Sequence, residues 1–187
     1  PSPNLYESTM SEISGNNSQQ SAESFLSKEL YEICNSDSLS KEGLHEIIEQ
    51  HDLTQKNLDV GDYEFFLEAC LNERVTEGTI QCLLEYFPDS ISTTDEKGRL
   101  PLHCACQNQN ITLNIIQLLI DAAPYSVRSA DEDGDTPLHY FCVNKNIDDA
   151  AALEILKLLV EKHPEAVRHA DNGGYLPIHI ASHNKNV

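Results

Sequence analysis

The chain has 187 residues, 40% of them hydrophobic, and its 31 acidic and 12 basic residues give a formal net charge of −19. This composition is typical of one or two soluble globular domains, and no apolar run approaches the about 18 residues that a membrane span needs. Since so negative a chain repels phosphate groups, we expect neither nucleic acid nor an anionic membrane as a partner.

The first segment, residues 1–22, is rich in Ser, Asn and Gln and shows no apolar periodicity. Such a composition cannot bury enough apolar surface to fold, so we predict a disordered lead-in. Helical patterns begin at Glu23, first in ESFLSKELYEIC and then in SKEGLHEIIEQH.

A regular spacing of similar residues then runs to the end of the chain. Cysteines recur at steps of 36 residues, each four positions after an apolar residue: Leu30 and Cys34, Phe66 and Cys70, Leu102 and Cys106, Leu138 and Cys142. Ile178 and Ser182 continue both columns after a step of 40. A period of this length indicates stacked supersecondary units. We predict degenerate units at about 23–55 and 56–92 and clear units at about 93–128, 129–168 and 169–187, the last one truncated.

Each unit is predicted to contain a helix, a turn, a second helix and a loop. Apolar residues in the second helix recur at spacings of three and four, which places them on one buried face. The three columns are Leu44, Ile80, Ile116, Leu156; Ile47, Leu83, Leu119, Leu159; and Ile48, Leu84, Ile120, Val160. Prolines at 88, 124 and 164 are expected to end this helix, because proline has no N–H. The loops at 95–98, 131–134 and 171–174 end in glycine, which is free to take a positive φ.

The segment DEDGDTPLHYFC at 131–142 resembles the ankyrin repeat, whose signature is Asp-x-x-Gly-x-Thr-Pro-Leu-His-x-Ala. Segments 95–106 and 171–182 match it as well, whereas the first two units share only the apolar columns. The resemblance implies an all-α, ankyrin-like solenoid of helix-turn-helix repeats with short hairpin loops. Long acidic ankyrin proteins of some protists have a similar pattern.

The resemblance also implies a role for each residue of the Pro-Leu-His turn. The proline begins the first helix, the leucine fills the core, and the threonine and histidine side chains tie adjacent units together. These roles fall on Pro101, Leu102 and His103, on Pro137, Leu138 and His139, and on Pro177, Ile178 and His179. Thr136 supplies the hydroxyl in its unit, whereas Leu100 and Leu176 replace it in the other two.

Two chemical alternatives arise from His103, Cys104 and Cys106, because imidazole and thiolate are zinc ligands and can form a nucleophilic pair. Residues two apart on a helix do not face one site, and free cysteine commonly acts as a small core residue. Histidines that recur with the period of the fold favour a structural role. We therefore expect no metal, no cofactor and no catalytic residue, and reduced thiols in a cytoplasmic or nuclear protein.

The resemblance implies a module that binds another protein through its concave face and hairpin tips, because stacked repeats present an extended surface. The residues expected to contact the partner are Glu96, Lys97, Arg99, Gln107 and Asn108; Glu132, Asp133, Asp135, Val143 and Asn144; and Asn172, Tyr175, His183 and Asn184. The acidic loop at 131–135 predicts that the partner binds through a basic segment. We expect the chain to be a monomer.

Two functions of other classes stay open at this point. The array could be the targeting arm of a longer enzyme whose catalytic domain lies outside this chain, or a spacer without a dedicated partner. The sequence lacks an initial Met and stops within a unit at Val187, so we expect it to be a fragment or a processed product.

Overall fold

The computed structural model describes residues 28–53 and 64–184, and among these residues it contains helices and no strand. The predicted lead-in at 1–22 lies outside the described residues. After a helical stretch at 28–34, the α-helices are α2 (Lys41–Gln50), α3 (Glu64–Leu71), α4 (Glu77–Tyr86), α5 (Pro101–Gln107), α6 (Leu113–Ala122), α7 (Pro137–Val143), α8 (Asp149–Lys162) and α9 (Pro177–Asn184). Three short 3₁₀ helices follow members of this series, η2 (Pro88–Ser92), η3 (Ser126–Arg128) and η4 (Pro164–Arg168).

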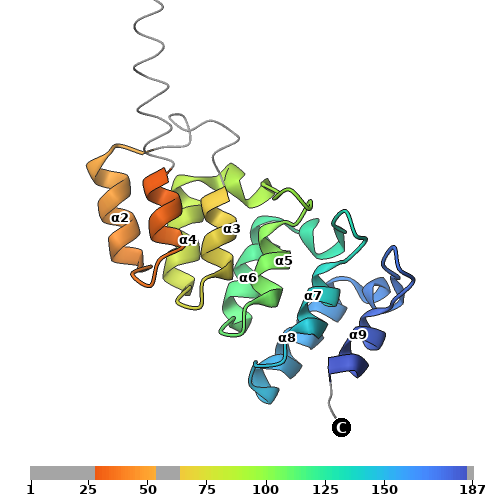
Figure 1. Cartoon of the computed structure of the whole chain (residues 1–187). Helices are drawn as coiled ribbons and strands as arrows, with labels where there is room; N and C mark the ends of the chain where they lie inside the picture. Colours follow the sequence, from red (N-terminus) through yellow and green to blue (C-terminus); the bar gives the residue numbers. More distant parts are fainter. Residues whose placement is uncertain (1–27, 54–63, 185–187) are drawn as a thin grey trace, which may run out of the picture.

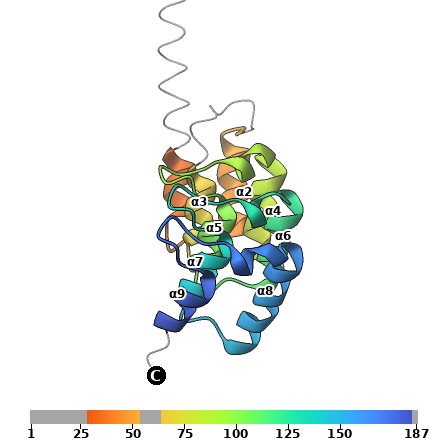
Figure 2. The ribbon, with the colours of Figure 1, turned by 90° about the vertical axis from the view of Figure 1, so that its right-hand side faces the viewer.

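The helices stand in two rows (Figure 1). The inner row consists of α3, α5, α7 and α9, and the outer row of α2, α4, α6 and α8, with each helix packed against the next one in its row. The second view, turned by 90°, shows the two rows side by side along the stack, with α3, α5, α7 and α9 in one and α2, α4, α6 and α8 in the other (Figure 2). Since α3 packs on α4, α5 on α6 and α7 on α8, this arrangement confirms the predicted all-α solenoid of helix pairs.

Local residue chemistry sets where the helices begin and end. Prolines occupy the first position of α5, α7 and α9, where a missing N–H costs no hydrogen bond. In the outer row the side chains of Ser40, Thr76 and Thr112 accept backbone N–H groups of the first turn, at 3.0, 3.1 and 3.3 Å. As predicted, the prolines at 88, 124 and 164 lie just beyond the last residues of α4, α6 and α8.

The predicted apolar columns form the core through most of the stack. Leu44, Ile80, Ile116, Leu83, Leu119 and Leu159 are all at most 1% exposed. Leu156, which these columns place on the buried face, is 38% exposed, and Ile178, which the resemblance places in the core, is 64% exposed, so the prediction is wrong for these two residues. The physical reason is position, because α8 and α9 are the last helices of their rows in the described chain and no further helix covers them.

An alanine at Gly134 is expected to destabilise the fold more than an alanine at Gly174. The two glycines have φ values of 82° and 81°, so both substitutions carry the left-handed strain of about 1–2 kcal/mol. A Cβ at Gly134 would lie 2.8 Å from the backbone N of Asn172, whereas nothing lies within 4 Å of a Cβ at Gly174. We expect urea denaturation to show an additional loss of at least about 1 kcal/mol for Gly134→Ala. Equal losses of stability in the two variants would mean that the loop at 171–175 shifts away from the added Cβ at no energetic cost.

Candidate binding surface

Three hairpin loops, at 95–99, 131–135 and 171–175, share one internal structure. Asp95 Oδ1 accepts the N–H groups of Lys97 and Arg99, both at 2.9 Å. In the next loop Asp131 Oδ1 accepts those of residues 133 and 135, at 3.0 and 2.8 Å. The glycines at 98, 134 and 174 have φ values of 75°, 82° and 81°, which confirms the predicted turns. The aspartate at the start of each loop therefore holds the loop in shape.

Successive hairpins are joined through their backbones. The N–H of Glu132 donates to the carbonyl of Lys97 at 2.9 Å, and the N–H of Asn172 donates to the carbonyl of Asp133 at 2.9 Å. The side-chain amide of Asn172 also donates to the carbonyl of Glu132, at 2.9 Å. These bonds align the three tips along the stack, so side chains of neighbouring units form one continuous surface.

The acidic character of this surface is weaker than the sequence suggests. Asp131 is only 8% exposed, and its Oδ2 accepts the hydroxyl of Tyr140 at 2.7 Å. Asp95 Oδ2 pairs with Arg99 Nε at 2.6 Å. Burial raises the pKa of the Asp95 carboxyl, but hydrogen bonds from the backbone and side chain of Arg99 outweigh it and lower the pKa overall. The carboxylates of Asp131 and Asp95 are therefore bonded within the protein rather than presented to a partner.

The exposed carboxylates at the tips are consequently those of Glu96, Glu132 and Asp133. Asp135 is half-buried, and burial raises the pKa of its carboxyl. Lys97 is exposed beside Glu96, whereas Arg99 is half-buried in its pair with Asp95. A smaller group of free charges than predicted therefore faces solvent on this surface.

The histidines of the Pro-Leu-His turn connect neighbouring units. His103 Nδ1 accepts the N–H of Leu100 at 2.9 Å, and its Nε2 is 3.1 Å from the carbonyl of Ser129 in the next unit, to which it donates. His139 is bonded in the same way, to the N–H and hydroxyl of Thr136 and, through Nε2 at 3.2 Å, to the carbonyl of Tyr175. In the unit where Leu100 replaces the threonine, the backbone N–H of Leu100 alone therefore donates to His103 Nδ1 and keeps the imidazole in place.

Neither chemical alternative at the HCAC stretch finds support in the surroundings of its residues. Burial raises the pKa of the Cys104 thiol to about 12, so this thiol stays protonated at neutral pH. His103 uses both ring nitrogens in hydrogen bonds. In the part of the chain that the structure describes, no three His, Cys, Asp or Glu side chains are grouped to hold a metal ion. The described cysteines at 34, 70, 82, 104 and 106 are free thiols and all five are buried, whereas Cys142 is half-buried.

Two hollows lie along the inner row. One, of about 270 Å³, lies between α3 and the hairpin at 95–99, and Glu64, Glu68 and Lys97 line it. The other, of about 480 Å³, lies at the carboxyl ends of α3, α5 and α7, where Leu71, Gln107 and Val143 meet. The predicted contact residues therefore gather in two places, at the hairpin tips and around the ends of the inner helices.

Asn108 and Asn144 border the second hollow, but their amide groups serve the fold. Asn108 is 4% exposed, and its Nδ2 donates to the carbonyls of Cys70 and Asn72 at 3.0 and 2.8 Å. Asn144 donates to the carbonyls of Cys106 and Asn108 at 3.3 and 2.8 Å. Because these amides are already bonded, we assign Asn108 a structural role and exclude it from the contact surface.

Residues 65–153 and 110–187 match the family of ankyrin repeats, in three copies. The chain belongs to the ankyrin-repeat family. No curated protein matches the chain at a significant level. Ankyrin repeats are generally protein–protein interaction modules and typically carry no catalytic activity. Among the described residues of this ankyrin array, no helix has the length and apolar character of a membrane span.

The remaining predicted contact residues lie toward the last ankyrin unit. Asn172 and Tyr175 are exposed in the third hairpin, and the Tyr175 side chain is 51% exposed. His183 is exposed near the end of α9. The side chain of Asn184 lies outside the described part of the structure. The surface thus runs from α3 to α9 along one side of the ankyrin stack.

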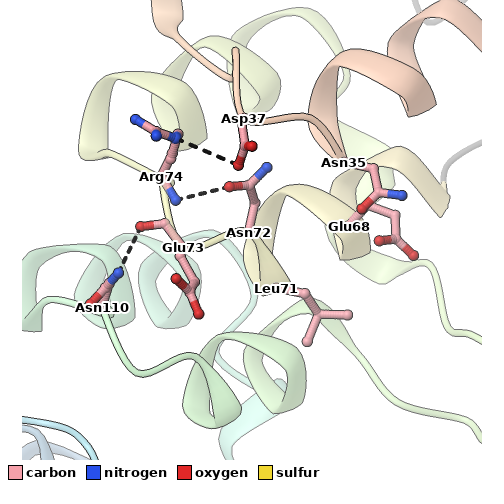
Figure 3. Close-up of a pocket in the computed structure, with 8 residues that line it drawn as sticks. All are labelled: Asn35, Asp37, Glu68, Leu71, Asn72, Glu73, Arg74 and Asn110. Atoms are coloured by element: carbon pink, nitrogen blue, oxygen red, sulfur yellow. Dashed lines mark hydrogen bonds and ion pairs between the residues drawn. The ribbon is translucent and has the colours of Figure 1, made fainter.

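The unit at 56–92 contributes residues that the motif did not reveal. Leu71, Asn72 and Glu73 line a hollow of about 460 Å³ together with Asp37 and polar neighbours (Figure 3). This unit lacks the Pro-Leu-His turn, so that motif alone does not locate it, although the family match begins at residue 65. The period does locate it, because Leu71 stands 36 residues before Gln107 and 72 before Val143.

The stability of the ankyrin array is expected to fall as the pH drops below about 6.5, the ordinary pKa of histidine. Burial lowers the pKa of His103, against the opposing effects of the Ser129 carbonyl and of Asp131, so the folded state resists a proton that the unfolded state accepts. The stabilisation is complete above the unfolded pKa and is lost as the pH falls through it toward the lower folded pKa.

Urea denaturation midpoints at pH 7.5 and 5.5 measure this effect. We expect His103→Gln to reduce the difference between the two midpoints, because the variant shares every other titrating group with the wild type. If His103→Gln keeps the full difference between the two midpoints, other titrating groups cause the pH dependence.

Proposed function

We propose that this ankyrin array binds another protein along the surface formed by its hairpin tips and the ends of its inner helices. The observation that carries the proposal is the pair of backbone hydrogen bonds between hairpins, from Glu132 to Lys97 and from Asn172 to Asp133. They hold exposed side chains of three units in a fixed row, so the surface is largely ordered before a partner arrives.

Two hollows along the inner row, one of them beside a hairpin tip, support the same surface. The hollow lined by Glu64, Glu68 and Lys97 opens next to the first hairpin, and that lined by Leu71, Gln107 and Val143 opens at the helix ends. Val143 is 44% exposed, which offers an apolar contact among polar ones. A partner segment that follows the inner row would meet both hollows in succession.

Charge favours a partner segment with lysine or arginine residues. The chain carries a net charge of −19, and Glu96, Glu132 and Asp133 are exposed on the tips. A field of one sign accelerates encounter with the opposite charge, and the acceleration weakens as salt screens it. We propose that the basic segment docks first on these three side chains.

The test changes the tip charges without changing the fold. Glu132→Gln combined with Asp133→Asn removes two exposed charges and keeps the backbone bonds of the hairpin. We expect association with a partner captured on the wild type to slow by about two-fold or more at low salt, with little difference at high salt. Glu46→Gln with Glu85→Gln, on exposed positions of α2 and α4, is the matched control.

A captured protein supports the proposal when the tip variant associates with it more slowly at low salt and the control variant associates with it at the rate of the wild type. Equal association by the wild type and both variants at every ionic strength would contradict the role of the tips. Light scattering of the unbound chain tests the expectation that it is a monomer.

A further inference from the structure

The carboxyl end of α3 lies where three hollows of the inner row meet. Leu71, the last residue of α3, borders the hollow beside the first hairpin, the hollow at the helix ends and the hollow of Figure 3, of about 270, 480 and 460 Å³. Glu68 borders the first and the third of them, and Glu73 the second and the third. Figure 3 shows these three residues in succession along the end of α3 and the turn after it. A half-buried leucine is thus flanked by two carboxylates.

This part of the stack has a unit on either side. The side-chain amide of Asn72 donates to the carbonyl of Cys34 in the preceding unit at 2.8 Å, and α3 packs against α5 of the following unit. The hollow of Figure 3 is bordered by Asn35 of the first unit and by Asn110 of the third. The exposed part of Leu71 therefore belongs to the middle of the inner row and not to an end of the stack.

The basic side chains at these hollows do not neutralise the two glutamates. Arg74 Nε lies 3.8 Å from the carboxylate of Asp37, so the arginine in the hollow of Figure 3 is already paired. Lys97 borders the hollow beside the first hairpin, and Lys145 borders the hollow at the helix ends. The hollow that Glu68 and Glu73 share is consequently negative.

Neutral donors hold both carboxylates in place. The hydroxyl of Tyr31 donates to Glu68 Oε1 at 3.4 Å, and the side-chain amide of Gln109 donates to Glu73 Oε1. The Glu68 carboxylate raises the pKa of the Tyr31 phenol, which is the effect of a negative charge close by. A neutral donor fixes a carboxylate without cancelling its charge, so both groups are prepared for a positive ligand.

We infer that the surface proposed above recognises a basic–apolar–basic segment of its partner, in which the apolar side chain packs on Leu71 and a lysine or arginine reaches each of Glu68 and Glu73. The inference rests on the proposed function and specifies the chemistry that the partner presents. The aliphatic stems of the basic residues pack beside the leucine while their charged ends meet the carboxylates. The charges of the hairpin tips act on the rate of encounter, whereas this site holds the bound segment.

Other occupants are less complementary to this site. The segment at 1–27 of the chain contains Glu7, Glu12 and Glu23 and no lysine or arginine, so its charge has the wrong sign. The net charge of −19 opposes the approach of a second copy. A basic segment of another protein is the occupant that the charges favour.

The test selects peptides on the full chain from a random library displayed on phage and measures the strongest one by fluorescence anisotropy. We expect the selected peptides to share an apolar residue between two basic ones. Glu68→Gln with Glu73→Gln should weaken binding by about tenfold or more, because two charge-assisted bonds are lost. Glutamine still accepts from Tyr31 and Gln109, so this variant should unfold at the temperature of the wild type. Leu71→Ala should weaken binding at low and high salt alike, whereas the loss in the glutamine variant should shrink at high salt.

The control Glu46→Gln with Glu85→Gln removes the same charge from exposed positions of α2 and α4 and should bind the peptide with the affinity of the wild type. The tip variant Glu132→Gln with Asp133→Asn should release the peptide at the rate of the wild type. Selected peptides without basic residues, or equal affinity of the wild type and the Glu68 and Glu73 variant, would overturn the inference. A captured partner that depends on the tips but not on these two glutamates would overturn it too, while leaving the proposed function in place.

Discussion

Replacing Leu119 by alanine is expected to lower the free energy of unfolding by about 2–5 kcal/mol, the usual cost of truncating a buried leucine. Leu119 is 0% exposed in α6, which is packed between α4 and α8 in the outer row. Helices on both sides limit how far the structure can collapse into the space left by the missing atoms. Urea denaturation followed by circular dichroism gives the measurement.

The matched control is Leu156→Ala, a leucine of the same columns on the next helix of the row. Since Leu156 is 38% exposed, we expect a loss of less than about 1 kcal/mol. Glu132→Ala, at an exposed hairpin tip, should stay within about 0.5 kcal/mol of the wild type. Comparable losses from all three substitutions would contradict the described burial.

Replacing Asn108 by alanine is expected to cost about 2–4 kcal/mol, although the change removes no apolar group. Its Nδ2 donates to the carbonyls of Cys70 and Asn72, and its Oδ1 accepts the N–H of Asn110 at 2.9 Å. The variant leaves two carbonyls without this donor at a position that is 4% exposed, and each unpaired buried group costs about 1–3 kcal/mol.

Asn108→Asp separates the loss of the donor from the loss of volume. The aspartate retains the shape and the acceptor oxygen but cannot donate when ionised, so we expect a loss at least as large as that of Asn108→Ala. Asn144→Ala, at a half-buried position with the same kind of bonds, should cost less. Full stability of Asn108→Asp would show that the amide contributes nothing.

The sequence predicts the repeat well because repetition multiplies each local signal. A proline at 101 or 137 is a weak helix start by itself, but three such prolines at matching positions indicate one rule for the chain. The predicted helix pairs, proline ends and glycine turns are confirmed for this reason. Thr76 and Thr112 begin their helices 36 residues apart, a further signal of the same kind.

The period does not distinguish the middle of a stack from its end. Leu156 and Ile178 occupy core columns, yet they are exposed because burial depends on a neighbouring helix rather than on the residue. The sequence also does not show which polar residues lie on the surface. Asp131 and Asn108 are polar and belong to turns, which favours an exposed site, and the fold buries both in hydrogen bonds.

The asparagine bonds at the ends of the inner helices all run in one direction. Asn72 donates to the carbonyls of Cys34 and Ser36, Asn108 to the preceding unit in the same way, and Asn144 to the one before its own. The end of each inner helix thus receives its donors from the unit that follows it, whereas the histidine bonds from His103 to Ser129 and from His139 to Tyr175 run from a unit to its successor. Adjacent units therefore supply hydrogen-bonding groups to one another in both directions, so the opening of one unit weakens the units on both sides of it.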